Sequence, residues 1–148
     1  EISLGLVGSE MCIRDSLYLY NRDRQTWVKS VTGDKPGTPE YTVEIFNAIK
    51  KAKEKGEQVV AFHNHPGSMP PSAADINAAL QNGYSAGYVL CHDGTIYKYS
   101  APKTKIIDAI YNKRVDSFKK TGYNEGDAQR KALEYLSELY DFSFREVK

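Results

Sequence analysis

Two histidines separated by one residue, His63 and His65, are followed ten residues later by Asp75. Side chains two positions apart on a strand project from the same face, so both imidazoles can grip one ion while Asn64 points away. Two imidazoles and a carboxylate, with a fourth tetrahedral position left to water, are the ligands of a catalytic zinc rather than a structural one. Such a zinc lowers the pKa of its water to about 7. The sequence therefore predicts a Zn²⁺ site at His63, His65 and Asp75.

The elements around these residues would bring them together. Residues 58–62 are a short apolar run, which predicts a buried strand that ends at His63. Residues 66–71 contain three prolines and a glycine and must form a loop. Ser72-Ala-Ala-Asp75 has the spacing of a capping box, with Asp in the place of the usual Glu, and predicts a helix that stops at Gly83. A loop of this length can return Asp75 to the end of the strand.

The remaining pattern predicts an α/β fold with a mixed β-sheet flanked by helices and a C-terminal helical extension. Turn-forming residues join apolar segments 17–20 and 25–28 into one hairpin, and His92-Asp-Gly94 joins 87–91 to 95–99 in another. Between them, Thr38 and Pro39 are expected to begin a helix that ends at Gly56. The apolar positions expected to face the core are Val43, Phe46, Ile49 and Ala52 in that helix, then Ile106, Ile107, Ile110, Val115 and Phe118, and finally Leu133, Leu136, Leu139 and Tyr140. A closing strand is expected within 142–147.

Phe62-His-Asn-His-Pro66 followed by Ser72-Ala-Ala-Asp75 resembles the motif of the JAMM family, also called JAB or MPN-plus: HxHP, a spacer, then SxxD. The resemblance covers Leu17 to Ser100, and its spacer here is short, with six residues between His65 and Ser72. It implies an MPN/JAB-like fold and zinc-dependent hydrolysis of peptide or isopeptide bonds. His63, His65 and Asp75 would hold the zinc, and Ser72 would be catalytic by holding the oxyanion or the water. A glutamate on an early strand would be the general base.

Residues 1–16 resemble the translation of a sequencing adapter rather than of a gene, so we expect them to be non-native. The expected organisation is then 1–16 non-native, 17–100 a JAB/MPN-like metallopeptidase core, and 101–148 a helical extension. The glutamate base would lie upstream of Leu17 and would be missing, which would impair hydrolysis. Without this segment the net charge changes from +1 to +3 and Cys91 is the only cysteine, so neither a Cys-based zinc knuckle nor an intrachain disulfide is expected.

Other functional classes fit the sequence less well than a metallopeptidase does. The weak net charge gives no reason to expect a nucleic-acid partner, and no apolar run is long enough to span a membrane. We expect a cytoplasmic protein that acts on a protein or peptide substrate, and it could be the C-terminal part of a larger phage or toxin polypeptide. Zinc nucleobase deaminases need HxE and PCxxC, which are absent, and the consecutive letters HNH do not reproduce a ββα-metal nuclease. The open alternatives are a non-catalytic MPN-type binding or assembly module and a RadC-like DNA-associated protein.

Overall fold

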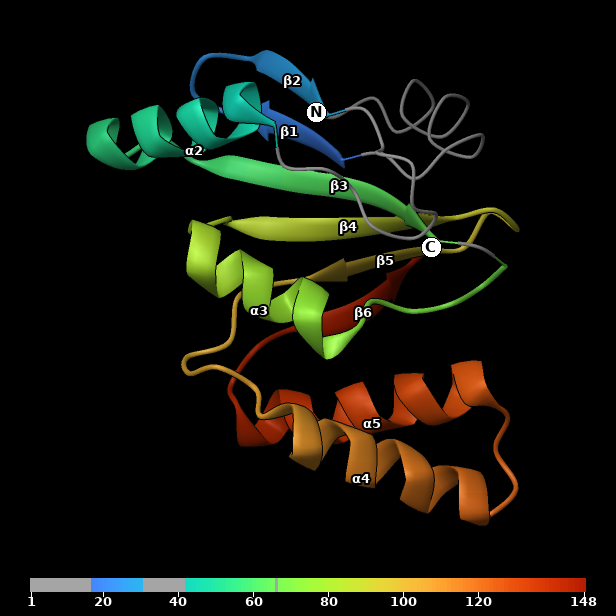
Figure 1. Ribbon diagram of the computed structural model, residues 1–148. Coiled ribbons are helices and arrows are strands. Elements are labelled where there is room, and N and C mark those ends of the chain that lie inside the picture. The colour runs from blue at the N-terminus through green and yellow to red at the C-terminus, as the bar shows by residue number, and fades with distance from the viewer. Residues whose placement is uncertain (1–16, 31–41, 66) are drawn as a thin grey trace.

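A computed structural model describes residues 17–30, 42–65 and 67–148. Within these ranges it contains one six-stranded mixed sheet and four helices, so the expected α/β class is confirmed (Figure 1). In chain order the elements are β1 (Leu17–Asn21), β2 (Thr26–Ser30), α2 (Val43–Lys55), β3 (Val59–His65), α3 (Ala73–Asn82), β4 (Ala86–Cys91), β5 (Ile96–Tyr99), α4 (Asp108–Lys120), α5 (Glu125–Leu139) and β6 (Phe144–Val147). The interpretation of residues 1–16 lies outside the described residues.

The sheet has the strand order β2-β1-β3-β4-β5-β6. Both expected hairpins are present, and every neighbouring pair is antiparallel except β3 and β4, which are parallel. Parallel neighbours need a crossover, and α3 provides it. The expected closing strand is β6, which pairs with β5 at one edge. The segment after residue 100 therefore contributes to the same sheet as the segment before it.

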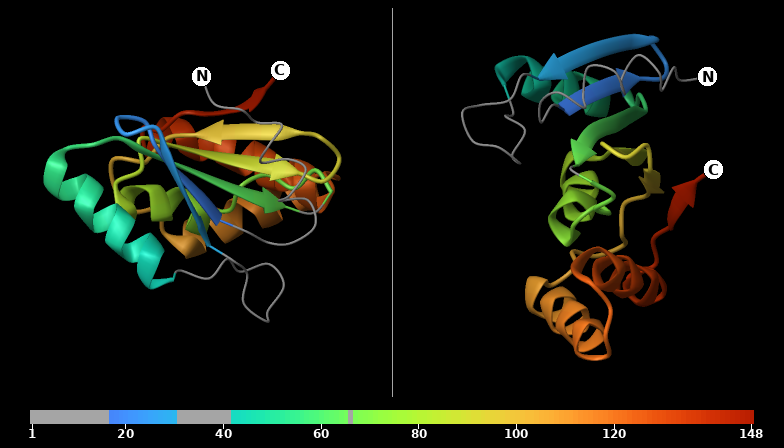
Figure 2. Two further views of the ribbon diagram at one scale, coloured as in Figure 1. Left: turned by 90° about the horizontal axis from the view of Figure 1, so that it is seen from above. Right: turned by 90° about the vertical axis from the view of Figure 1, so that its right-hand side faces the viewer.

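The two faces of the sheet differ in what covers them. The larger hydrophobic cluster joins one face to all four helices, through residues such as Leu19, Ile45, Ile76 and Leu136. A smaller cluster around Phe62 on the opposite face contains strand residues alone among those described. Figure 2 shows the helices along one face and the lower edge of the sheet. Alternation along β3 thus directs His63 and His65 to the helix-covered face.

Helix α2 corrects two expectations. It begins at Val43 with Thr42 as its N-cap, whose side chain accepts a hydrogen bond from the backbone of Ile45, so Thr38 does not cap it. Thr38 and Pro39 themselves lie outside the described residues. Its buried face is Ile45, Ile49 and Ala52, whereas Val43 is 74% exposed and Phe46 is 54% exposed. The spacing of apolar residues in this helix is compatible with two neighbouring faces, and the face that carries Ile45 is the one that packs against the sheet.

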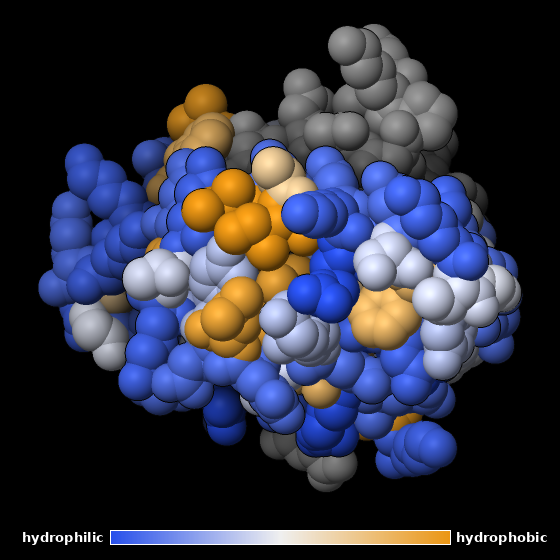
Figure 3. Space-filling view, turned by 90° about the horizontal axis from the view of Figure 1, so that it is seen from below, coloured by the Kyte–Doolittle hydropathy of each residue, from blue (hydrophilic) through white to orange (hydrophobic). Residues whose placement is uncertain are grey.

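The C-terminal helices pack on the main core. Val115, Leu133 and Leu136 are buried, together with Tyr111. Ile107, Ile110 and Leu139 are exposed instead, and Figure 3 shows apolar side chains on the lower side of the molecule. Ile106 and Ile107 precede α4, which begins at Asp108. None of the described helices combines the length and apolar character that crossing a bilayer requires.

Candidate metal centre

Strand β3 carries both candidate histidines. It continues to His65, two residues beyond the expected end at His63, because β4 still pairs with it there, whereas the pairing with β1 ends at His63. His63 lies opposite Leu17 of β1, and His65 lies opposite Cys91 of β4. His63 is 6% exposed and His65 is partly buried. The two imidazoles are therefore held by a central strand rather than by a flexible end.

The start of α3 places Asp75 against these rings. Ser72 is the N-cap, and its Oγ accepts a hydrogen bond from the Asp75 backbone N–H at 3.2 Å. In return, the Ser72 N–H donates to Asp75 Oδ2 at 2.8 Å, which completes the predicted capping box. The helix ends at Gly83, whose φ of 73° is the left-handed conformation that favours glycine. The short spacer is thus sufficient to return the carboxylate to β3.

The three predicted ligand atoms converge. His63 Nε2 and His65 Nε2 are 3.1 Å apart, and each lies 3.3 Å from Asp75 Oδ2. The edge of a regular tetrahedron is about 1.6 times the distance from its centre to a corner, so zinc ligands at roughly 2.0–2.1 Å stand roughly 3.3–3.4 Å apart. The observed triangle fits one face of such a tetrahedron. His63, His65 and Asp75 are therefore a group that could hold a metal ion.

The electrostatics of the group favour positive charge next to Asp75. Burial would raise the pKa of the Asp75 carboxyl, but the charges and hydrogen bonds of His63 and His65 outweigh it and hold this pKa well below its ordinary value of 3.8. Burial lowers the pKa of His65, but the hydrogen bond and charge of Asp75 outweigh it, and this pKa lies above its ordinary value of 6.5. A carboxylate in this position stays ionised and draws positive charge toward the two imidazoles.

The loop between the ligands contributes two backbone carbonyls that the sequence analysis missed. His65 Nδ1 lies 3.2 Å from the Met69 oxygen and 3.0 Å from the Pro70 oxygen. Carbonyl oxygens only accept hydrogen bonds, so Nδ1 carries a hydrogen, and in the neutral imidazole Nε2 keeps the lone pair that a metal ion would bind. Main-chain acceptors leave no mark in side-chain types, although the position of the loop directly after His65 was a usable signal.

The C-terminal extension also reaches this loop. A Cβ added at Gly126, in the first turn of α5, would meet the Met69 sulfur at 3.5 Å, so the Met69 side chain lies against that helix. Tyr111 of α4 is buried, which raises the pKa of its hydroxyl, and the negative charges of Glu125 and Asp75 add to the effect. Residues after 100 thus form part of the wall beside the candidate metal centre.

Asn64 and His92 lie apart from this centre. The Asn64 side chain is buried, and its Nδ2 is 3.4 Å from His92 Nε2 in the turn after β4. His92 is exposed and occupies the expected hairpin turn. The third histidine of the chain therefore does not join His63 and His65.

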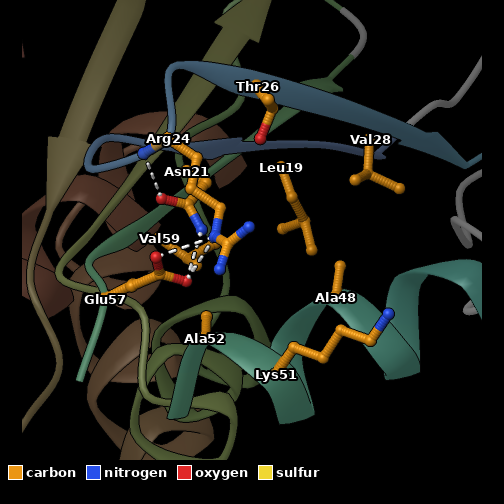
Figure 4. A pocket seen from close by; sticks show the side chains of 10 residues that line it. All are labelled: Leu19, Asn21, Arg24, Thr26, Val28, Ala48, Lys51, Ala52, Glu57 and Val59. Carbon is orange, nitrogen blue, oxygen red and sulfur yellow. Dashed lines mark hydrogen bonds and ion pairs between the residues drawn. The ribbon is translucent and has the colours of Figure 1, made fainter. Parts of the chain in front are cut away.

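A second polar cluster lies at the opposite end of β3 and lines a pocket of about 120 Å³ (Figure 4). Arg24 Nε donates to both oxygens of Glu57, at 2.8 and 3.0 Å, and Asn21 Nδ2 donates to one of them at 3.3 Å. Asn21 Oδ1 also accepts two backbone hydrogen bonds in the turn between β1 and β2. These bonds tie that turn to the beginning of β3.

Comparisons with protein-family models and with curated proteins give no match for this chain. In the described part of the chain, the metal-binding group consists of His63, His65 and Asp75, with no glutamate among its members.

Proposed function

We propose that the chain binds one zinc ion through His63 Nε2, His65 Nε2 and Asp75 Oδ2, and that it belongs to the JAMM type of zinc-dependent peptide or isopeptide hydrolases. The observation that carries the proposal is the convergence of these three atoms within 3.1–3.3 Å of one another. Two neutral imidazoles and one carboxylate carry a single negative charge, so a bound divalent cation would keep a net positive charge. That favours Lewis-acid chemistry over a purely structural role.

When bound, zinc would supply activation of water and polarisation of the substrate carbonyl near neutral pH. The protein's own residues supply orientation. His65 is fixed by its Nδ1 hydrogen bonds to the loop, and Asp75 is fixed by the Ser72 N–H. Ser72 Oγ accepts from the Asp75 backbone, which leaves its hydroxyl hydrogen available to donate to an oxyanion on the substrate. Ser72 would thus both cap α3 and stabilise charge that develops during hydrolysis.

A general base is the missing part of this proposal. JAMM-type hydrolysis calls for a glutamate, and none belongs to the group formed by the described residues. Glu57 lies at the other end of β3 with both oxygens hydrogen-bonded to Arg24. We therefore propose that this chain binds zinc and hydrolyses peptides slowly. The same observation favours a second candidate, a non-catalytic MPN-type module that keeps its metal.

The test begins with chelator-treated protein titrated with Co²⁺ and Zn²⁺. We expect one ion per chain and the visible absorption of four-coordinate Co²⁺, displaced by Zn²⁺. Absence of binding at micromolar protein and metal would refute the metal site. The zinc-loaded protein is then incubated with a fluorogenic isopeptide substrate. Slow turnover that Asp75→Asn abolishes supports the hydrolase, whereas stoichiometric binding without turnover over days supports the non-catalytic module.

A further inference from the structure

The loop between His65 and Ser72 is supported by the β4–β5 hairpin. Its carbonyl groups at positions 67, 68 and 69 each accept a hydrogen bond from the β4–β5 hairpin. The donors are the Asp93 N–H to Gly67 at 3.2 Å, the Tyr97 hydroxyl to Ser68 at 3.2 Å, and the Cys91 Sγ to Met69 at 3.3 Å. Gly67 and Ser68 are exposed. The hairpin therefore defines the path of residues 67–69 of this loop.

Two of these donors are side chains, and the sheet register explains their position. Cys91 ends β4 directly opposite His65 of β3, and Tyr97 lies on β5 opposite Val89. Both side chains are buried, at 3% and 5% exposure, and belong to the cluster on the helix-covered face. The Cys91 and Tyr97 side chains therefore lie on the same face of the sheet as the histidines, against the loop that leads to Asp75.

The Met69 carbonyl connects this support to the metal centre. Its oxygen accepts from Cys91 Sγ and is also 3.2 Å from His65 Nδ1. Displacement of the loop would carry the Met69 carbonyl and the adjacent Pro70 carbonyl away from Nδ1. The other tautomer would then be permitted, with a hydrogen on Nε2 where the ligand lone pair is needed. Cys91 and Tyr97 donate to the loop carbonyls, so the loop can pass their effect to His65.

We infer that Cys91 and Tyr97 are positioning residues of the metal centre, which fix the tautomer and ring orientation of His65 by hydrogen bonding to the loop carbonyls at Met69 and Ser68. This inference rests on the metal-binding part of the proposed function and not on hydrolysis. Neither residue is needed as a ligand. The β4–β5 hairpin then positions the metal centre as well as forming part of the sheet.

The experiment compares single-atom changes. Tyr97→Phe removes only the hydroxyl, and Cys91→Ala removes the thiol, while Cys91→Ser restores a donor at the same position. Tyr88→Phe is the matched control, because Tyr88 belongs to the same hairpin but packs in the cluster on the opposite face. Metal affinity is measured by Zn²⁺ competition with a chelator, and the thermal midpoint of the metal-free protein is recorded for each variant.

We expect Tyr97→Phe and Cys91→Ala each to weaken zinc binding about 10-fold, within the range typical of groups that orient metal ligands. Cys91→Ser and Tyr88→Phe should stay within about 3-fold of the original chain. Equal affinity in all four variants would overturn the inference while leaving the metal site intact. The inference would also be overturned if the loss of zinc affinity were proportional to the fall in thermal midpoint in every variant, Tyr88→Phe included.

A second readout does not depend on metal. In the metal-free protein near pH 8, nitrogen NMR of the His65 ring should show the hydrogen on Nδ1 in the original chain and in Cys91→Ser. In Cys91→Ala and Tyr97→Phe the spectrum should shift toward a mixture of tautomers. An unchanged ring spectrum would contradict the inference even if the original chain bound no zinc, so failure of the positioning role and failure of the metal site are separable.

Discussion

Asp75 and Glu57 are carboxylates at opposite ends of β3, and each has nitrogen partners within 3.3 Å. Glu57 faces Arg24, a permanent cation whose Nε donates to both carboxylate oxygens. Asp75 faces two imidazoles, which carry no charge when deprotonated. The first cluster contains a fixed positive charge, whereas the second gains one only when an imidazole takes up a proton or a metal ion binds.

This difference gives a criterion for separating a structural ion pair from a candidate site. Burial and short contacts are common to both clusters, and the pocket is at the Glu57 end. What distinguishes the Asp75 cluster is an excess of acceptors over fixed cations, which the raised pKa of His65 reflects. The structural role of one end and the binding role of the other can be tested by changing each cluster separately.

The largest effect is expected for Asp75→Asn, which removes the only negative charge among the three ligands. Zinc affinity should fall by more than about 100-fold, beyond the range typical of groups that only orient ligands. The matched change at the other end is Glu57→Gln, which should leave zinc affinity unchanged. Competition with a chelator measures both. Similar losses in the two variants would end the distinction between the clusters.

A smaller effect is expected from pH. Zinc needs deprotonated imidazoles, and the pKa of His65 is raised above 6.5, so a proton competes with the metal at higher pH than it would at an ordinary histidine. Apparent affinity should rise with pH through the raised pKa of His65 and level off above it. Below that pKa the loss is about tenfold per pH unit for each proton displaced. Asp75, with its lowered pKa, should remain ionised throughout. A flat affinity between pH 5 and 8 would contradict this account.

Ser72→Ala should cost about 1 kcal/mol of unfolding free energy, because it removes the acceptor for the Asp75 N–H at the start of α3. The thermal midpoint of the metal-free protein should fall by about 2–4 °C. Ser72→Thr keeps the oxygen and should recover most of the loss. If Ser72→Ala and Ser72→Thr lower the thermal midpoint equally, the Ser72 cap does not stabilise the start of α3.

The smallest effect is expected for Arg24→Ala. The Arg24 side chain is 50% exposed, and exposed ion pairs contribute up to about 1 kcal/mol. Stability should change by no more than that, and zinc affinity should not change. Denaturant unfolding followed by the metal titration would check both values. A loss of metal binding here would show that the two ends of β3 are coupled.

The residues of the candidate metal centre could be predicted from short stretches of sequence. The HxH spacing predicted that both histidines lie on one face of β3, and the spacing of Ser72 and Asp75 predicted the cap of α3. The three predicted ligands converge in the structure. The start of α2 was wrong because Thr38 and Thr42 both suit an N-cap and the choice depends on tertiary packing. The support from Cys91 and Tyr97 was missed because it depends on strand register across 20 or more residues and on main-chain acceptors.

All three ligands come from residues 63–75, within the unit formed by β3 and α3. Closing so short a segment costs little chain entropy, so an unfolded chain should retain some affinity for zinc. Zinc would then raise the thermal midpoint by less than its native affinity implies, since part of the binding is shared with the denatured ensemble. It would also be able to organise this unit early in folding, before the distant partners β5 and β6 join the sheet.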